Sequence, residues 1–250
     1  MQHFLWWNRD DLAPYFSLMM LRHLKPVVKE CTRFSKSLNP VDLVDFVTQL
    51  DAAFSEHQPD PTKDLLISCE GLCGHLPGWP NVESYAAVPT LMTFLVGYLC
   101  ERFPDAQVRV VLTTREPESW LFSAWRHHLR GHRLTEDYAA FAARLRPAAD
   151  LDDMVEEVRD ALAPLPVIAL PLETSQHDLQ GPGGALINLM NVPDWVRGDL
   201  EPVGAGNTGP EEDMYQQFLD LNRSNLSDDE VQARKSGMAE AVALGGWKHR

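Results

Sequence analysis

The sequence predicts an α/β protein with a mainly parallel sheet and helices on both faces of that sheet. Three short apolar runs, typical of buried parallel strands, lie at residues 64–69, 108–114 and 166–172. Segments with helical spacing of apolar residues separate these runs. Strands that alternate with helices favour a parallel sheet, and such sheets bind ligands at the carboxyl ends of their strands. A functional site is therefore expected around Ser68–Glu70, Thr113–Arg115 and Leu172–Thr174.

The expected helices follow from apolar periodicity and from capping residues. The segment from residue 1 to about 24 has the spacing of helices that are broken near Pro14. Asn39-Pro40 is a typical helix start, and the helix continues to about residue 57. Further helices are expected at about 89–103, 117–130, 135–146, 151–162, 185–190, 211–221 and 227–244, with loops at 71–80 and 201–210.

Length and charge restrict the class of protein. The chain has 250 residues, 22 Lys+Arg and 36 Asp+Glu, and therefore a formal net charge of −14. We expect a single domain over 1–250, with an α/β core at 1–200 and a helical C-terminal extension at 201–250. An acidic chain repels nucleic acid and anionic membranes, so neither is an expected partner. A local basic site for a small anion remains compatible with this charge.

Neither a membrane span nor a secretory signal is expected. The longest apolar candidate is the ten-residue run Leu91–Cys100, whereas a span needs about 18 residues. The N-terminus has no basic region ahead of an apolar stretch. Four cysteines favour reduced thiols in a cytoplasmic protein. Cys69 and Cys73, followed by His75, lack a fourth ligand at a usual spacing, so no metal is expected.

The end of the second apolar run carries the residues best suited to bind an anion. Arg115 leaves a buried strand just before a helix that Pro117 opens, and Ser123 lies about two turns into that helix. A guanidinium offers phosphate a fork of donors, and a serine hydroxyl adds another. In the alternative interpretation, Arg115 pairs with a carboxylate and Ser123 is a small buried residue. The segment is also locally basic, with Arg126, Arg130, Arg133, His127, His128 and His132.

These residues resemble a motif of the sulfotransferases that use 3′-phosphoadenylyl sulfate (PAPS). In that family an arginine at a strand end and a serine eight residues later hold the 3′-phosphate, which implies this role for Arg115 and Ser123. Leu65-Leu-Ile-Ser68-Cys-Glu70 is similar to a strand of the bacterial sulfotransferase-like proteins. Arg115-x-Pro117-x-x-Trp120-x-x-Ser123, followed by a basic stretch and Phe141, is similar to their central block. The resemblance covers about residues 60–175 and implies a P-loop NTPase/sulfotransferase-like fold.

The sequence departs from this family at its N-terminus. Sulfotransferases bind the 5′-phosphosulfate on a loop of the form Gly-x-x-Lys-Ser/Thr-Gly, which follows the first strand and opens the first helix. Backbone N–H groups there cradle the anion, and the lysine stabilises developing charge. Residues 1–8 look like the helix after that loop, with Gln2 in the position of a family glutamine. We therefore expect the first strand and the loop to be missing, through a misplaced start, a truncated chain or degeneration. An in-frame strand and loop encoded just upstream would identify a misplaced start.

Further residues complete the predicted site. The resemblance implies a base at the strand end, for which Glu70 is the first candidate and His75 the second. A carboxylate that caps a loop or pairs with Arg115 is the structural alternative for Glu70. Arg234 and Lys235 resemble an Arg-Lys-Gly motif that contacts the 3′-phosphate, although charged residues of a terminal helix usually form a solvated face. The glycine-rich segment Gln180–Gly184 contains no lysine and is expected to be a loop.

The resemblance implies sulfuryl transfer from PAPS to a hydroxyl or amine of a small-molecule or glycan acceptor, without a metal. The alternative is a non-catalytic or truncated relative that binds a nucleotide or a partner. A phosphotransferase of the nucleoside-kinase type would share the fold but need Mg²⁺ and the same loop. Without the loop lysine, the 250-residue chain is expected to be inactive. With an unpaired strand edge, it is expected to be poorly soluble or to form a homodimer through that edge.

Overall fold

The structure, a computed structural model, describes residues 1–175, 177–203 and 212–246. The chain divides into two compact units. Unit 1 consists of Met1–Glu116 and Asp150–Gly206, and unit 2 consists of Pro117–Ala149 and Asn207–Arg250. The C-terminal helices thus share a unit with a central segment of the chain, whereas the sequence predicted one domain with a C-terminal extension.

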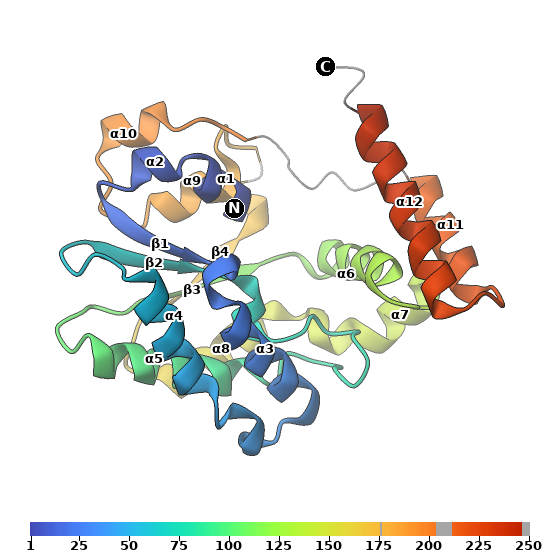
Figure 1. Ribbon diagram of the computed structural model, residues 1–250, viewed down its shortest axis with the longest axis horizontal. Coiled ribbons are helices and arrows are strands. Elements are labelled where there is room, and N and C mark those ends of the chain that lie inside the picture. The colour runs from blue at the N-terminus through green and yellow to red at the C-terminus, as the bar shows by residue number, and fades with distance from the viewer. Residues whose placement is uncertain (176, 204–211, 247–250) are drawn as a thin grey trace. The chain divides into compact units, whose positions relative to one another are not determined.

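Unit 1 is built from strands and from the helices that cover them (Figure 1). In chain order its elements are α1 (Gln2–Trp7), α2 (Arg9–Leu12), β1 (Phe16–Met20), α3 (Leu21–Ser37), the 3₁₀ helix η1 (Pro40–Leu43), α4 (Phe46–His57), β2 (Asp64–Ser68), η2 (Glu70–Cys73), α5 (Val88–Arg102), β3 (Val110–Thr114), α8 (Leu151–Leu162), β4 (Val167–Pro171), η4 (Leu172–Thr174), α9 (Gly181–Ile187) and α10 (Asp194–Asp199).

Unit 2 is helical in the part of it that the structure describes. Its elements are α6 (Pro117–Gly131), α7 (Tyr138–Leu145), η3 (Arg146–Ala149), α11 (Glu212–Arg223) and α12 (Asp228–Gly246). Asp137 begins α7 by accepting a hydrogen bond from the main-chain N–H of Ala140, at 2.9 Å. Across both units, no helix of the described ranges combines the length and the apolar character that a membrane crossing requires.

The strands of unit 1 form two parallel pairs. In one pair β1 lies beside β2, with Phe16 opposite Asp64 and Met20 opposite Ser68. In the other, β3 lies beside β4 in register from Val110–Val167 onward. The three predicted strands are confirmed as β2, β3 and β4 within a mixed α/β fold. The expectation of one sheet needs correction, because hydrogen bonds among the described residues join the strands only two by two.

The strand β1 corrects the prediction that the N-terminal segment is helical. Phe16, Met19 and Met20 have the spacing of a helix face, yet the segment is extended. The reason is that both faces of β1 are covered: Phe16 and Leu18 pack into one core and Met19 into another. A strand that is buried on both sides reads as an unbroken apolar run, which periodicity alone does not distinguish from a buried helix.

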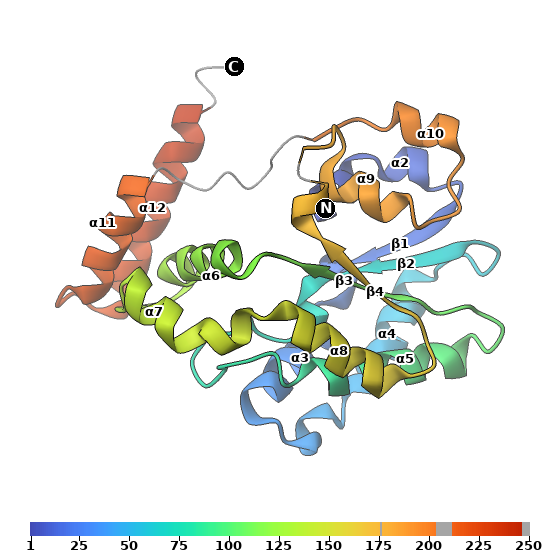
Figure 2. The same ribbon diagram turned by 180° about the vertical axis from the view of Figure 1, so that it is seen from behind.

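Two apolar cores cover the opposite faces of the strands. The first core packs alternate strand residues such as Ile67 and Leu112 against α3, α4, α5 and α8. The second core packs the intervening residues, among them Leu66 and Val111, against α1, α2, α9 and α10. Figures 1 and 2 show these two helix layers on opposite sides of the strands. The prediction of helices on both faces is confirmed. Gln180–Gly184, expected to be a loop, instead opens α9.

The start of α3 predicts an acid-sensitive contact. Nδ1 of His23 accepts a hydrogen bond from the main-chain N–H of Met20 at 3.0 Å, and the His23 ring stacks on His57 at 4.1 Å. Burial, followed by the charges of His57 and Arg22, lowers the pKa of His23 to about 4. The unfolded chain takes up this proton at pH about 6.5 and the folded chain only near 4. The neutral His23 ring therefore stabilises the folded state above pH 6.5. This contribution is lost as the pH falls from about 6.5 to about 4.

We expect the urea midpoint of His23→Gln to fall less than that of the wild type between pH 7 and pH 4.5. The variant cannot be protonated at this position, whereas all other titrating groups are shared. Urea unfolding of both proteins at several pH values measures the difference. Parallel pH profiles for the two proteins would contradict the assignment.

Candidate functional site

The carboxyl ends of the strands in unit 1 carry the residues that the sequence singled out. Arg115 follows β3 directly, and Glu70 follows β2 after a single residue. All four strands run the same way across unit 1 in both views, so these ends lie on one side of the strands (Figures 1 and 2). The main-chain N–H of Glu116 donates to Oε1 of Glu173 at 3.1 Å, which ties the end of β3 to the end of β4. Arg115 and Glu70 thus follow strand ends, as the sequence predicted, and their functional roles stay predictions.

Arg115 is half-buried at the junction between β3 and α6. Its partner in the predicted phosphate site, Ser123, is an exposed residue of α6. The two residues belong to different units, Arg115 to unit 1 and Ser123 to unit 2. Their joint action on one anion stays a prediction of the sequence.

Glu70 is exposed and begins the short helix η2. Its carboxylate acts on the amino group of Met1: burial lowers the pKa of that group, and the Glu70 charge opposes the shift.

His75 lies in the loop after η2 and is held against α3. Its main-chain N–H donates to Oγ of Ser35 at 3.0 Å, and its ring stacks on Trp79 with centroids 4.7 Å apart. Burial, with a smaller effect of Lys36, lowers the pKa of His75. The imidazole is therefore neutral at neutral pH and is able to accept a proton. No contact between His75 and Glu70 is recorded among the described residues.

Arg234 and Lys235 are neighbours in α12 with opposite environments. Arg234 is exposed and lines an open groove with Asp220 and Leu226. Lys235 is only 1% exposed, and its ammonium group donates to the carbonyls of Leu129 at 2.8 Å and His132 at 2.9 Å. Burial, followed by the charge of Arg133, lowers the pKa of Lys235 to about 8. In this arrangement Lys235 caps the carboxyl end of α6.

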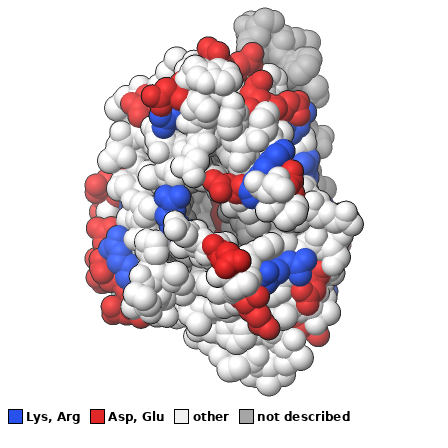
Figure 3. All heavy atoms as spheres, turned by 90° about the vertical axis from the view of Figure 1, so that its left-hand side faces the viewer, with Lys and Arg blue, Asp and Glu red and all other residues white. Residues whose placement is uncertain are grey.

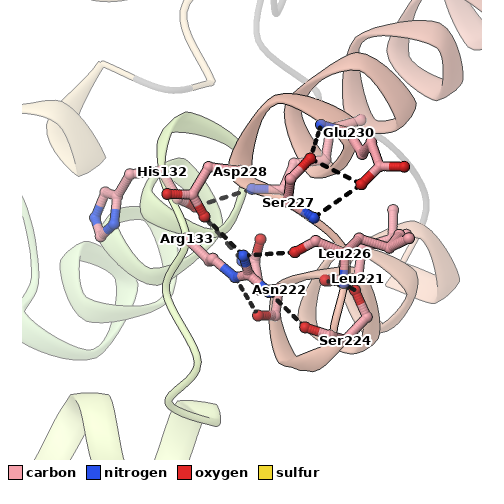
Figure 4. Close-up of polar contacts among 10 residues, drawn as sticks. His132, Arg133, Leu221, Asn222, Ser224, Leu226, Ser227, Asp228 and Glu230 are labelled. Carbon is pink, nitrogen blue, oxygen red and sulfur yellow. Dashed lines mark hydrogen bonds and ion pairs between the residues drawn. The ribbon is translucent and has the colours of Figure 1, made fainter.

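A polar network that the sequence did not predict fastens the segment after α6 to the C-terminal helices (Figure 4). The Arg133 guanidinium donates to the carbonyls of Asn222 and Leu226, each at 2.9 Å, to the carbonyl of Ser224 and to the Asp228 carboxylate at 2.7 Å. Nδ2 of Asn222 donates in return to the carbonyl of Leu134 at 2.8 Å. The local basic stretch was interpreted as suited to anions, but Arg133 is committed to these acceptors.

The cysteine cluster has the properties of buried thiols. Burial raises the pKa of Cys31 and of Cys73 to about 12, so both stay protonated at neutral pH. Protonated thiols are poor metal ligands and poor nucleophiles. Within the described ranges, no group of three or more histidine, cysteine, aspartate and glutamate side chains is placed to hold a metal ion.

The segments that join each strand to the following helix are the places where a loop could bind an anion. β1 passes directly into α3, and β4 directly into η4. Only Cys69 lies between β2 and η2, and only Arg115 and Glu116 lie between β3 and α6. None of these four junctions contains a glycine-rich turn or a lysine. Arg115 is thus the cation that the described junctions offer.

Comparisons of the chain with protein-family models, with curated proteins and with solved structures found no match.

Proposed function

We propose that the protein is a sulfotransferase-like nucleotide-binding protein that holds the 3′-phosphate of PAPS, or of adenosine 3′,5′-bisphosphate, with Arg115. The observation that carries the proposal is the position of this half-buried arginine at the carboxyl end of a parallel strand. Ligands of open parallel sheets bind at this side, and a guanidinium matches the geometry of a phosphate. The two strand pairs of unit 1 add support, because loss of a central strand would leave a parallel sheet divided in this way.

The transfer step needs more than the described residues provide. Sulfuryl transfer requires a cradle for the 5′-phosphosulfate and a cation at its bridging oxygen. The four strand junctions supply neither, so we propose that the 250-residue chain binds the nucleotide without transferring the sulfuryl group. In a complete site, Glu70 would accept the proton of the hydroxyl or amine acceptor, since it follows the strand end more closely than His75 does.

Arg115→Met is expected to weaken the binding of adenosine 3′,5′-bisphosphate by about tenfold to a hundredfold. This range corresponds to the loss of one charge-assisted hydrogen-bonded contact. Titration calorimetry with the wild type and the variant measures the change. Arg109→Met is the matched control, because Arg109 is an exposed arginine just ahead of the same strand, at its opposite end.

Two results would contradict the proposal. One is an unchanged affinity in Arg115→Met. The other is equal binding of adenosine 5′-monophosphate, which lacks the 3′-phosphate. Competition between PAPS and ATP distinguishes the sulfotransferase class from a nucleoside-kinase-like class, since the latter favours ATP with Mg²⁺.

A further inference from the structure

Helix α3 concentrates positive charge on one side, although the chain as a whole has a net charge of −14. Its 17 residues hold five of the 22 lysine and arginine residues, and its single carboxylate, Glu30, is buried. All five cations are exposed: Arg22, Lys25, Lys29, Arg33 and Lys36. At about 100° per residue, these positions fall within an arc of about 80° and extend over about 21 Å of the helix. We call this row of cations the basic stripe.

The basic stripe is mostly without carboxylate partners. Within the described ranges, Arg33 is its only member in an ion pair, with Glu30 and with Asp42. The Arg22 guanidinium lies 3.9 Å from the centre of the Trp6 ring, a contact that leaves its charge in place. The opposite side of α3 is apolar and buried against the first core. Helix α3 is therefore a basic amphipathic helix whose charged side faces away from the core.

Aliphatic side chains are exposed in the segment that follows α3. Four of them recur every three residues and are between 44% and 72% exposed: Leu38, Val41, Val44 and Val47. Residues three apart share one side of a 3₁₀ helix and are neighbours on an α-helix. The three valines, which extend from η1 to the start of α4, therefore lie on one side of this segment. We call the four residues the aliphatic stripe. Exposed apolar residues that form a continuous patch are typical of surfaces that bind proteins or membranes.

The basic stripe and the aliphatic stripe meet at the C-terminal end of α3. The Arg33 guanidinium donates to the main-chain carbonyl of Asp42 at 2.8 Å, and its Nε lies 3.2 Å from the Asp42 carboxylate. The Ser37 hydroxyl also donates to this carboxylate. These bonds hold η1, which carries Val41, beside the last turn of α3, which carries Lys36. Cations and aliphatic side chains are therefore neighbours on the surface of unit 1.

The local charge of α3 differs from that of other parts of the surface. Over the face that Figure 3 shows, basic side chains lie scattered among acidic ones. The net charge of the chain led to the expectation that anionic membranes are repelled, but this expectation averages over the whole surface. At physiological ionic strength, charges more than about 8 Å apart are largely screened from each other. The cations that touch a ligand therefore decide whether it is attracted to α3.

We infer that the basic stripe and the aliphatic stripe form a docking surface for an anionic lipid membrane. A row of lysines and arginines on an amphipathic helix is typical of segments that bind anionic headgroups. The exposed valines enter the boundary between headgroups and acyl chains, as the apolar residues of interfacial helices do. A nucleic acid would contact the cations but leave the aliphatic side chains in water, whereas a lipid surface uses both. The inference does not depend on the proposed nucleotide site.

Flotation of the full chain with phospholipid vesicles tests the basic stripe. We expect binding to mixed vesicles of phosphatidylserine and phosphatidylcholine, and binding about tenfold weaker or less to phosphatidylcholine alone. Lys25→Gln combined with Lys29→Gln should weaken binding to the mixed vesicles about 25-fold, because each cation near an anionic surface contributes about fivefold. Arg109→Gln combined with Arg130→Gln is the matched control, since it removes the same charge from exposed arginines outside α3. The control should bind like the wild type.

Val41→Ser combined with Val44→Ser tests the aliphatic stripe. We expect this variant to bind the mixed vesicles about tenfold more weakly, because two aliphatic side chains no longer leave water on binding. Leu179→Ser is the control, since Leu179 is an aliphatic residue that is 80% exposed outside the stripe. All of these substitutions are at exposed positions, where changes in stability are small.

Four outcomes would overturn the inference. Absence of flotation with the mixed vesicles would remove the docking surface. Equal weakening by the lysine pair and by the arginine pair would show that net charge, rather than the basic stripe, governs binding. Unchanged vesicle binding after the two valine substitutions would show that the aliphatic stripe does not enter the lipid. Tighter binding to a single-stranded oligonucleotide than to the vesicles would assign the basic stripe to a nucleic acid.

Discussion

Lys235→Met is expected to lower the free energy of unfolding of unit 2 by about 2 to 4 kcal/mol. The substitution removes the charged donor from the carbonyls of Leu129 and His132, which still accept the longer hydrogen bonds from Nδ2 of Asn222, at 3.3 and 3.5 Å. Each hydrogen bond from a charged donor contributes about 1.5 to 3 kcal/mol. The substitution also removes a positive charge from the carboxyl end of α6, where the helix dipole favours one. Relief from burying that charge offsets part of the loss. Native-state hydrogen exchange of the α6 amides measures the difference.

Arg234→Met is the matched control for this prediction, because Arg234 is the exposed neighbour in the same helix. A surface substitution of this kind changes stability by about 0.5 kcal/mol or less. A pH series adds a second readout, since Lys235 has a pKa of about 8 when folded and 10.5 when unfolded. Unit 2 of the wild type should gain stability as the pH rises between these values, because the unfolded state then binds more protons. Equal stability of the two variants would refute the capping role.

Gly74→Val is expected to destabilise unit 1 by about 3 to 5 kcal/mol. Gly74 has φ +82° and ψ −153°, a conformation that only glycine adopts without strain, and other residues there lose about 1 to 3 kcal/mol. A Cβ atom at this position would also lie 2.6 Å from Cβ of Ser35 and 3.3 Å from the carbonyl oxygen of Cys31. The loop that carries His75 would have to leave α3. Denaturant unfolding measures the loss.

The control for Gly74→Val is Gly97→Ala. Gly97 lies inside α5, and a Cβ atom there would meet nothing within 4 Å. Alanine favours a helix interior over glycine by about 1 kcal/mol, so this variant should be more stable than the wild type. Opposite signs for the two glycine substitutions are the expected result. A loss below 1 kcal/mol in Gly74→Val would show that the loop relaxes away from Ser35.

An element could be predicted from the sequence when local residues determine its structure, and could not when contacts with distant residues do. Strands β2, β3 and β4 were predicted because each is a short apolar run between turn or helix signals. The run at β1 was not, because Phe16, Met19 and Met20 also fit a helix face, and only pairing with β2, far along the chain, makes it extended. Helix α3 was missed as well, since Pro26 and the buried Glu30 interrupt its apolar pattern.

The residues of the candidate site show the same difference between local and long-range contacts. The positions of Glu70 and Arg115 at strand ends depend on local sequence and could be predicted. The role of Lys235 depends on two carbonyls that are 106 and 103 residues away in the chain, and no local pattern reports them. Motif resemblance grouped Lys235 with Arg234, whereas tertiary packing separates them. Burial, which single-sequence reasoning does not supply, decides which of two adjacent cations can meet a ligand.

The hydrogen bonds that join the helices of unit 2 determine which residues there can be substituted during evolution. Arg133, Asn222 and Lys235 all donate to main-chain carbonyls, which every amino acid possesses. A substitution at a donor position therefore loses the hydrogen bond, while the residues that supply the acceptors, such as Leu226, can exchange their side chains without losing it. We expect substitutions along α11 and the turn after it to be tolerated more widely than substitutions of these three donors.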